Sequence, residues 1–381
     1  MNKNERKSSV EAKGKSVLFI SNVPSPYNVE YLNELGKLIN VVAVFERGSS
    51  GERDKSWKDL NVKNFECNIL QGIKWATDSA LSFGSFKYIR KYRQDYIIIG
   101  NPSTPTGVLS ILYCKLHKIP YILQSEGGFA GTGKGLKEKF KKFLMKDAKL
   151  YLTGMKKNDY FMTYGATAEK LKNYPFSSFY KKDILSALPT RAEKNDAKKR
   201  IKVDPDKKMI LFVGRFVKGK GVDTLIKACE DIEGITLCLV GGEPTVEYLD
   251  LLKQTGLQQK TQIVDFIGKE KLKQYYLATD VFVLPTHTDT WGLVINEAMS
   301  FGLPIITTKM CVAGLELIKN GENGYLIDVG DYKKLHDFIE IIVSDDDLRT
   351  KMGDENLKII NNYSYENMAK VIFNSITETV S

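Results

Sequence analysis

Short apolar runs alternate with longer amphipathic stretches along the chain, and this pattern predicts alternating β-strands and α-helices. In the first half the predicted strands lie at residues 15–21, 41–45, 96–100 and 120–124. In the second half they lie at residues 209–213, 235–240, 262–266, 281–284 and 304–307. Such alternation is typical of parallel sheets that carry helices on both faces.

The alternation restarts near residue 200, and 381 residues exceed one typical globular core, so we expect two domains. The predicted parts are a loose tail at 1–15, a Rossmann-like domain at 16–190, a linker at 191–208, a second Rossmann-like domain at 209–362 and a helix at 363–381. We expect this last helix to pack back across the seam between the domains. Two such sheets facing one another would form a cleft for two substrates, as a transferase needs.

The two halves of the chain differ in charge. Residues 1–190 hold 31 Lys and Arg against 17 Asp and Glu, whereas residues 191–381 hold 25 against 29, giving +14 and −4. A basic half implies an anionic partner. An acidic membrane surface, a diphosphate-bearing acceptor and nucleic acid all fit, and charge alone does not choose among them.

Part of the positive charge lies in a predicted amphipathic helix at residues 134–149. Leu136, Phe140, Phe143 and Leu144 recur there at helical spacing under a lysine-rich face. In one interpretation this apolar stripe packs on the sheet of the first domain, and in the other the helix lies on an anionic membrane. Both can hold at once, because lysines can extend past an apolar face to reach charged groups.

Several classes of protein do not fit the sequence. No apolar run reaches the ~18 residues of a membrane-spanning helix. The first residues lack the apolar segment of a secretory signal, so we expect a cytoplasmic protein. The five cysteines are scattered and only three histidines are present, so we expect no disulfide framework, no metal centre and no cofactor.

The first motif with chemical potential reads MILFVGRFVKGKGVDTLIKA and starts at residue 209. It predicts a strand, a Gly-rich turn and a helix, with Gly214, Arg215 and Lys220 in the turn. Backbone N–H groups, two cations and the helix dipole would converge there, which suits a diphosphate. The spacing matches neither the P-loop nor the dinucleotide-binding glycine motif. The alternative is a pair of surface cations on a loop.

The second motif reads PTHTDTWGLVINEAMSFGLPII and predicts a polar loop that leads into a helix. Asp289 lies in the loop, and Glu297 follows eight residues later. The N–H groups of Gly292, Leu293 and Val294 at the predicted helix start can be donated to a phosphate. Glu297 can then accept the paired hydroxyls of a ribose, and Asp289 those of a sugar. Alternatively, a glutamate in a first turn only stabilises the helix dipole.

Together with NGENGYLID, these motifs resemble the group 1 glycosyltransferases of the family 4 type over roughly residues 205–330. The resemblance implies the two-domain GT-B fold, a nucleotide-sugar donor, no metal and retention at the anomeric carbon. It places the family's phosphate-binding cations on Arg215 and Lys220. Its Glu-x7-Glu motif falls on Asp289 and Glu297, with Asp in place of the commoner first Glu.

Shorter segments extend the resemblance. LVGGEP and VDFIGK resemble loops that line the nucleotide, so Ile267 and Lys269 are expected to border the base. VPSPYNVEYLNELG, SEGGFAGTGKG and YPFSS look like segments of enzymes that assemble bacterial surface polysaccharides. Glu126 follows a predicted strand, where many relatives carry a histidine, and would help to position donor or acceptor. Alternatively, it caps the turn at Gly127 and Gly128.

We therefore expect a retaining, metal-independent glycosyltransferase of bacterial surface polysaccharide synthesis. A UDP-sugar is the expected donor, and a hydroxyl of a lipid-linked or saccharide molecule is the expected acceptor. The expected catalytic residues are Arg215, Lys220, Asp289 and Glu126. The inner face of the cell membrane is an expected peripheral site, and nucleic acid is not an expected partner. The alternatives are a non-hydrolysing nucleotide-sugar epimerase and a basic protein that binds membranes or nucleic acid.

Overall fold

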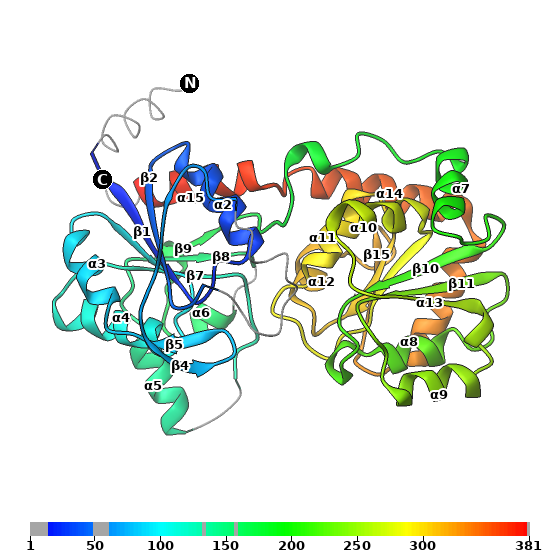
Figure 1. Ribbon diagram of the computed structural model, residues 1–381, viewed down its shortest axis with the longest axis horizontal. Helices are drawn as coiled ribbons and strands as arrows, with labels where there is room; N and C mark the ends of the chain where they lie inside the picture. The colour runs from blue at the N-terminus through cyan, green and yellow to red at the C-terminus, as the bar shows by residue number, and fades with distance from the viewer. Residues whose placement is uncertain (1–13, 49–60, 132–134, 156–158, 379–381) are drawn as a thin grey trace. The chain divides into compact units, whose positions relative to one another are not determined.

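The computed structural model describes residues 14–48, 61–131, 135–155 and 159–378. The chain divides into two compact units, Met1–Ser177 with Ser364–Ser381, and Ser178–Tyr363. Within each unit a parallel sheet has helices on both of its faces (Figure 1). This confirms the predicted α/β class with two Rossmann-like sheets.

In the first unit the described residues form a seven-stranded parallel sheet in the order β3-β2-β1-β6-β7-β8-β9. Its strands are β1 (Ser16–Ser21), β2 (Asn40–Phe45), β3 (Glu66–Ile69), β6 (Tyr96–Ile99), β7 (Ile122–Ser125), β8 (Leu150–Thr153) and β9 (Leu171–Asn173). A separate antiparallel pair is formed by β4 (Ile73–Ala76) and β5 (Ser79–Leu81). The helices are α2 (Pro26–Gly36), α3 (Ser85–Lys91), α4 (Pro105–Leu116), α5 (Leu136–Met145), α6 (Asp159–Thr163), the short η2 (Ala168–Lys170) and α15 (Tyr365–Glu378).

Local sequence explains where the central helices of this unit begin. The Ser25 side chain accepts a hydrogen bond from the backbone N–H of Asn28, and Pro26 opens α2. Thr104 and Pro105 repeat this arrangement at the start of α4. A capping hydroxyl followed by proline is a strong helix start, because proline has no N–H that would need a partner there.

The second unit contains a six-stranded parallel sheet in the order β12-β11-β10-β13-β14-β15. Numbered along the chain, this is the 3-2-1-4-5-6 order of the Rossmann fold. The strands are β10 (Lys208–Val213), β11 (Ile235–Val240), β12 (Thr261–Val264), β13 (Val281–Leu284), β14 (Ile305–Thr308) and β15 (Gly324–Ile327). The α-helices are α7 (Arg191–Arg200), α8 (Val222–Ala228), α9 (Val246–Gln254), α10 (Lys269–Ala278), α11 (Leu293–Ser300), α12 (Val312–Leu317), α13 (Tyr332–Ser344) and α14 (Asp346–Ile360). The short helical turns are η3 (Lys181–Asp183), η4 (Lys218–Lys220) and η5 (Gln258–Lys260).

The region expected to be a linker contains a helix. α7 begins with a capping box in which the Thr190 side chain accepts from the Glu193 N–H and the Glu193 carboxylate accepts from the Thr190 N–H. The helix packs against α10 of the second unit. Its charged residues had suggested a linker, whereas the Thr-x-x-Glu pattern is a recognised helix start.

The last helix, α15, belongs to the first unit although it follows the second unit in the sequence. It packs against α2, and its buried side chains Met368, Ile372 and Ile376 recur every four residues. Residues 1–13 of the expected tail and 379–381 of the expected helix lie outside the described residues.

The apolar stripe of α5 is largely exposed. Leu144 is buried, but Leu136, Phe140 and Phe143 are 86%, 50% and 48% exposed. The interpretation in which the whole stripe packs on the sheet is therefore wrong for these three residues. The packed face of α5 contains Leu144 and Met145 instead, and Lys134 lies outside the described residues.

Candidate functional site

The candidate site of the second unit lies where its strand order reverses. β10 and β13 are hydrogen-bonded neighbours, yet the chain leaves β10 toward β11 and leaves β13 toward β14 on the other side. In folds of this kind ligands bind outside the carboxyl ends of the strands at such a reversal, so the loops after β10 and β13 mark the candidate site.

Hydrogen bonds join the two loops. The Gly219 carbonyl accepts from the His287 backbone N–H at 2.8 Å and from the Thr286 hydroxyl at 2.9 Å. Gly221, with φ of +68°, separates η4 from α8, and a Cβ atom on it would overlap the Pro285 carbonyl. Only glycine combines this backbone conformation with such a close approach.

This arrangement brings together two of the predicted site residues. Lys220 Nζ lies 2.5 Å from Asp289 Oδ2, and both side chains are partly buried, with exposed fractions of 23% and 17%. The other oxygen of Asp289 accepts from the Trp291 backbone N–H at 3.4 Å. The predicted phosphate-binding cation and the predicted sugar-binding carboxylate thus form an ion pair, a contact that the sequence did not suggest.

Gly214 and Arg215 occupy the start of the first loop. The Gly214 N–H donates to the Val240 carbonyl, so β10 and β11 stay paired to their ends. The Gly241 backbone approaches Gly214 so closely that a Cβ on Gly241 would overlap the Gly214 carbonyl. The next residue, Arg215, has an exposed side chain.

The second loop leads into the N-terminus of α11. Gly292, with φ of +100°, directly precedes Leu293 and Val294, the first residues of the helix. The opening N–H groups of a helix have no acceptor within it, and its dipole favours an anion at this end. The loop is anchored by Trp291, which is buried and donates from its indole N–H to Asn296 Oδ1 at 2.8 Å.

Glu297 lies one turn further along α11. Its carboxylate accepts from the Tyr276 hydroxyl at 3.0 Å and from the Ser178 hydroxyl at 3.2 Å. Burial raises the pKa of Glu297 above its usual value, although these two donors act in the opposite direction. Carboxylate oxygens can accept further hydrogen bonds beyond these two, so Glu297 retains capacity for ligand hydroxyls.

Ile267 lies at the end of the β12–α10 loop, and Lys269 is the first residue of α10. Lys269 Nζ donates to the Ser178 carbonyl at 3.2 Å and lies 3.8 Å from Asp183. The structure thus connects Lys269 to Glu297 through Ser178. Ile267 is partly buried in the same loop.

Glu126 belongs to the first unit, directly after β7. It is partly buried, and its charge adds to burial in raising the pKa of the buried Tyr174 hydroxyl. In the turn at Gly127 and Gly128, the Ser125 hydroxyl donates to the Gly127 carbonyl at 2.9 Å.

Sequence reasoning missed several polar residues that contact Glu297 or lie at the strand reversal of the first unit. The hydroxyls of Tyr276 and Ser178 donate to Glu297. Tyr276 falls in no recognisable motif, and Ser178 ends the segment YPFSS, which indicated no contact with Glu297. In the first unit, Asn101 Nδ2 donates to Asn22 Oδ1 at 2.8 Å, where β1 and β6 form the corresponding reversal of strand order. The asparagines follow strand ends, which is the one signal that could have identified them.

The described residues carry neither a metal cluster nor a membrane span. None of them forms a group of three or more His, Cys, Asp or Glu that could hold a metal ion. Within the same ranges, no helix is long and apolar enough to cross a membrane.

Most of the second unit matches a family profile. Residues 193–358 match the profile described as Glycosyl transferases group 1. The uncharacterized glycosyltransferase MJ1607 of Methanocaldococcus jannaschii is 32% identical over 188 residues, or 48% of each chain. The capsular polysaccharide biosynthesis glycosyltransferase CapM of Staphylococcus aureus is 31% identical over 161 residues, 41% of this chain and 42% of CapM. The chain thus covers about half or less of the length of these relatives.

Solved structures share the fold over nearly the whole chain. Anabaena Alr3699/HepE in complex with UDP and glucose matches with a TM-score of 0.73 at 17% identity, covering 96% of this chain and 99% of that one. WaaG, a glycosyltransferase involved in lipopolysaccharide biosynthesis, matches with a TM-score of 0.65 at 14% identity, covering 94% and 98%. These matches support the GT-B fold that the sequence motifs implied.

Proposed function

We propose that this chain transfers a sugar from a UDP-sugar to an acceptor hydroxyl. Its residues 193–358 match the glycosyl transferases group 1 family. The observation that carries the proposal is the ion pair between Lys220 and Asp289, set beside the N-terminus of α11 where the strand order reverses. The site thus combines a cation, the opening N–H groups of a helix and a carboxylate that would accept sugar hydroxyls, at the edge where a nucleotide would bind.

The diphosphate would be stabilised by charge already in position. Arg215, Lys220 and the N–H groups from Gly292 to Val294 would hold its oxygens, and they would act most strongly as the bond to the sugar breaks. Donor binding would divide the existing ion pair, because the diphosphate takes Lys220 while sugar hydroxyls are donated to Asp289. These groups can neutralise the leaving group without a metal ion.

The remaining residues would fix the rest of the donor. Glu297 would accept the ribose hydroxyls, and Ile267 and Lys269 would border the base. The anomeric configuration would be retained. UDP is favoured because the related structure of HepE contains UDP and glucose, and we extend that ligand class to this chain as part of the proposal.

The acceptor is proposed to be a lipid-linked saccharide of bacterial surface polysaccharide synthesis, bound by the basic first unit. Support comes from the roles that two relatives are named for, CapM and the Rhizobium meliloti lipopolysaccharide core biosynthesis glycosyltransferase LpsE. Glu126 of that unit would then position donor or acceptor.

A product assay tests the proposal. The full chain would be incubated with radiolabelled UDP-glucose or UDP-galactose, EDTA and a bacterial membrane lipid extract. We expect the label to enter a lipid-soluble product despite EDTA. Label that stays on the nucleotide would contradict the proposal, and conversion of the donor sugar without acceptor would establish the epimerase alternative.

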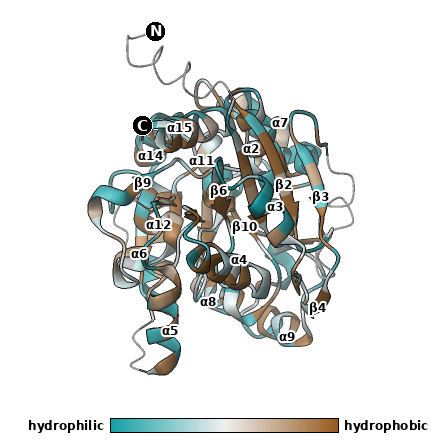
Figure 2. Cartoon of the chain, turned by 90° about the vertical axis from the view of Figure 1, so that its left-hand side faces the viewer, coloured by the Kyte–Doolittle hydropathy of each residue, from teal (hydrophilic) through white to brown (hydrophobic). Residues whose placement is uncertain are grey.

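We also propose that α5 holds the chain on the cytoplasmic face of an anionic membrane. The exposed side chains of Leu136, Phe140 and Phe143 share one side of the helix, and brown apolar and teal polar stretches adjoin along α5 in Figure 2. The neighbouring side carries the exposed lysines Lys139 and Lys142. An apolar face beside a lysine row is the arrangement by which a helix lies on an anionic bilayer.

Vesicle sedimentation of the full chain tests this membrane role. Lys139→Glu with Lys142→Glu should weaken binding to phosphatidylglycerol vesicles about tenfold or more, because each lysine near the surface contributes ~1 kcal/mol. Lys87→Glu with Arg90→Glu changes the same charge on exposed positions of α3 and should bind like the parent. Equal losses of vesicle binding in both double variants would show that binding depends on net charge and not on α5. Absence of vesicle binding by the parent would refute the membrane role. Lys141 is not varied, because it donates to the Tyr164 hydroxyl at 3.2 Å.

A further inference from the structure

A second recess in the second unit lies far from the candidate site. It has a volume of about 410 Å³, within the range of small-molecule sites. Lys208 opens β10 and Asp280 precedes β13, so the recess lies at the amino ends of the strands. The pair of Lys220 and Asp289 lies beyond the carboxyl ends, about 20 Å away along a six-residue strand.

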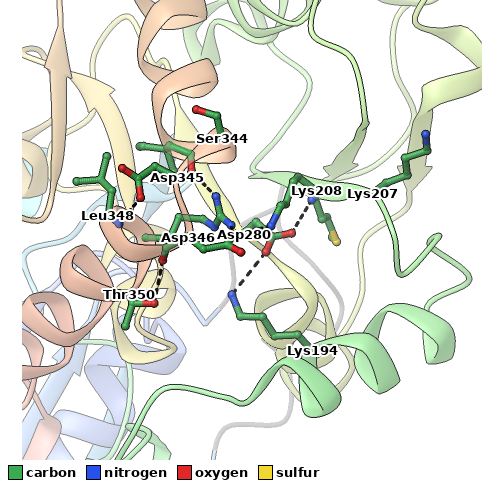
Figure 3. A network of polar contacts seen from close by, with 12 residues as sticks. Lys194, Lys207, Lys208, Asp280, Ser344, Asp345, Asp346, Leu348 and Thr350 are labelled. Atoms are coloured by element: carbon green, nitrogen blue, oxygen red, sulfur yellow. Dashed lines mark hydrogen bonds and ion pairs between the residues drawn. The ribbon is translucent and has the colours of Figure 1, made fainter.

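The lining of this recess carries excess positive charge. It includes six cationic residues, Arg191, Lys194, Lys198, Lys207, Lys208 and Arg349, against three acidic ones, Asp206, Asp280 and Asp346. Figure 3 shows that the Lys207 side chain points away from the others. Without Lys207, the five remaining cations still outnumber the three carboxylates.

The inner carboxylate, Asp280, has several partners within the protein. Asp280 accepts from Lys198 Nζ and from the Met209 N–H, each at 2.8 Å, and lies 3.7 Å from Lys194 (Figure 3). These contacts hold its pKa below the usual value, although burial acts in the opposite direction. One carboxylate therefore compensates the buried Lys198 and the partly buried Lys194.

The outer cations share a weakly held partner. Lys208 lies 2.8 Å from Asp346, and Arg349 pairs with the same carboxylate. Asp346 is 78% exposed, so water competes for its charge and it neutralises little. Burial lowers the pKa of Lys208, and the positive charges of Arg349 and Arg191 lower it further. Arg191, Lys208 and Arg349 therefore share a local excess of positive charge.

We propose that this recess is a binding site for a phosphate-bearing anion, separate from the nucleotide-sugar site. The phosphate group would lie between Arg191, Lys208 and Arg349, where charge-assisted hydrogen bonds relieve the repulsion among the cations. Arg349 is fixed for this role because its guanidinium also donates to the Ile342 carbonyl. The site does not depend on the proposed transferase activity.

Phosphate titration of the full chain tests the site, by calorimetry and by thermal unfolding in inorganic phosphate against sodium chloride of equal ionic strength. Arg191→Gln with Lys208→Gln should raise the phosphate Kd about tenfold or more, because two charge-assisted bonds are lost. Arg191 is exposed and Lys208 is repelled by its neighbours, so this variant should remain folded, which its unfolding midpoint without phosphate checks.

Two variants locate the binding. Lys199→Gln removes one charge from the exposed side of α7 outside the recess and should bind phosphate like the parent. Lys220→Ala changes only the proposed donor site, so the phosphate binding that Arg191→Gln with Lys208→Gln removes should persist in it. If phosphate binding is lost in Lys220→Ala but kept in the double variant, the anion binds at the donor site and the proposal is overturned. Equal effects of phosphate and chloride would overturn it as well.

Discussion

The carboxylate of Glu297 is placed to accept ligand hydroxyls, and its burial lowers the stability of the fold at neutral pH. Burial raises its pKa, so the folded chain binds this proton more readily than the unfolded chain does. Stability from the protonated form is present at low pH and is lost as the pH rises through the raised pKa. At neutral pH the ionised carboxylate therefore destabilises the fold, and a polar ligand that donates to it would offset this effect.

Glu297→Gln should separate stability from binding. The amide can keep both protein contacts, so at pH 7 we expect an unfolding temperature equal to or above that of the parent. This difference should shrink as the pH falls below about 4, where the carboxyl of the parent becomes protonated in both states. UDP should bind about tenfold more weakly or worse, because a charged acceptor is lost. A lower unfolding temperature at pH 7 with unchanged UDP affinity would show that Glu297 is structural.

At the scale of elements, the start of α8 is held against the end of β13. Gly221 makes this approach possible, and the Gly219 carbonyl is bonded to the β13–α11 loop. These contacts set the distance between Lys220 and Asp289, which are 69 positions apart in the sequence.

Gly221→Ala should disturb this junction. A left-handed backbone costs an alanine ~1–2 kcal/mol before the overlap with Pro285 is counted, so we expect a loss of at least ~1 kcal/mol in unfolding free energy. Gly219→Ala is the matched control, because no atom lies within 4 Å of the place that its Cβ would take, and it should change stability by ~0.5 kcal/mol or less. Denaturant unfolding of both variants measures these changes in unfolding free energy. Equal stabilities of the two variants would contradict the account of this junction.

The elements also show what the sequence can predict. The nine strands expected from apolar runs and the Gly-rich turn at residues 214–221 were predictable, because apolar runs and glycines act locally. The sequence did not identify the short strands β3, β4, β5, β8, β9 and β15. The contact between Lys220 and Asp289 was not predictable, since it depends on which strands are neighbours. Nor was the exposure of Phe140, because helical spacing identifies an apolar face without showing what covers it.

At the scale of the whole chain, the two units carry different parts of the proposed activity. The family match and the candidate donor site lie in the mildly acidic second half. The basic first half carries α5 and its exposed lysines.

The most direct test of the central claim is turnover of a UDP-sugar by Lys220→Ala in the presence of EDTA, compared with Lys218→Ala. Lys218 is an exposed lysine of the same short helical turn, so its removal controls for charge and local structure. We predict that Lys220→Ala lowers turnover roughly 10²-fold or more, as loss of a charge-stabilising donor does, while Lys218→Ala stays near the parent. Equal activity of the two variants would contradict the assignment of the diphosphate to Lys220.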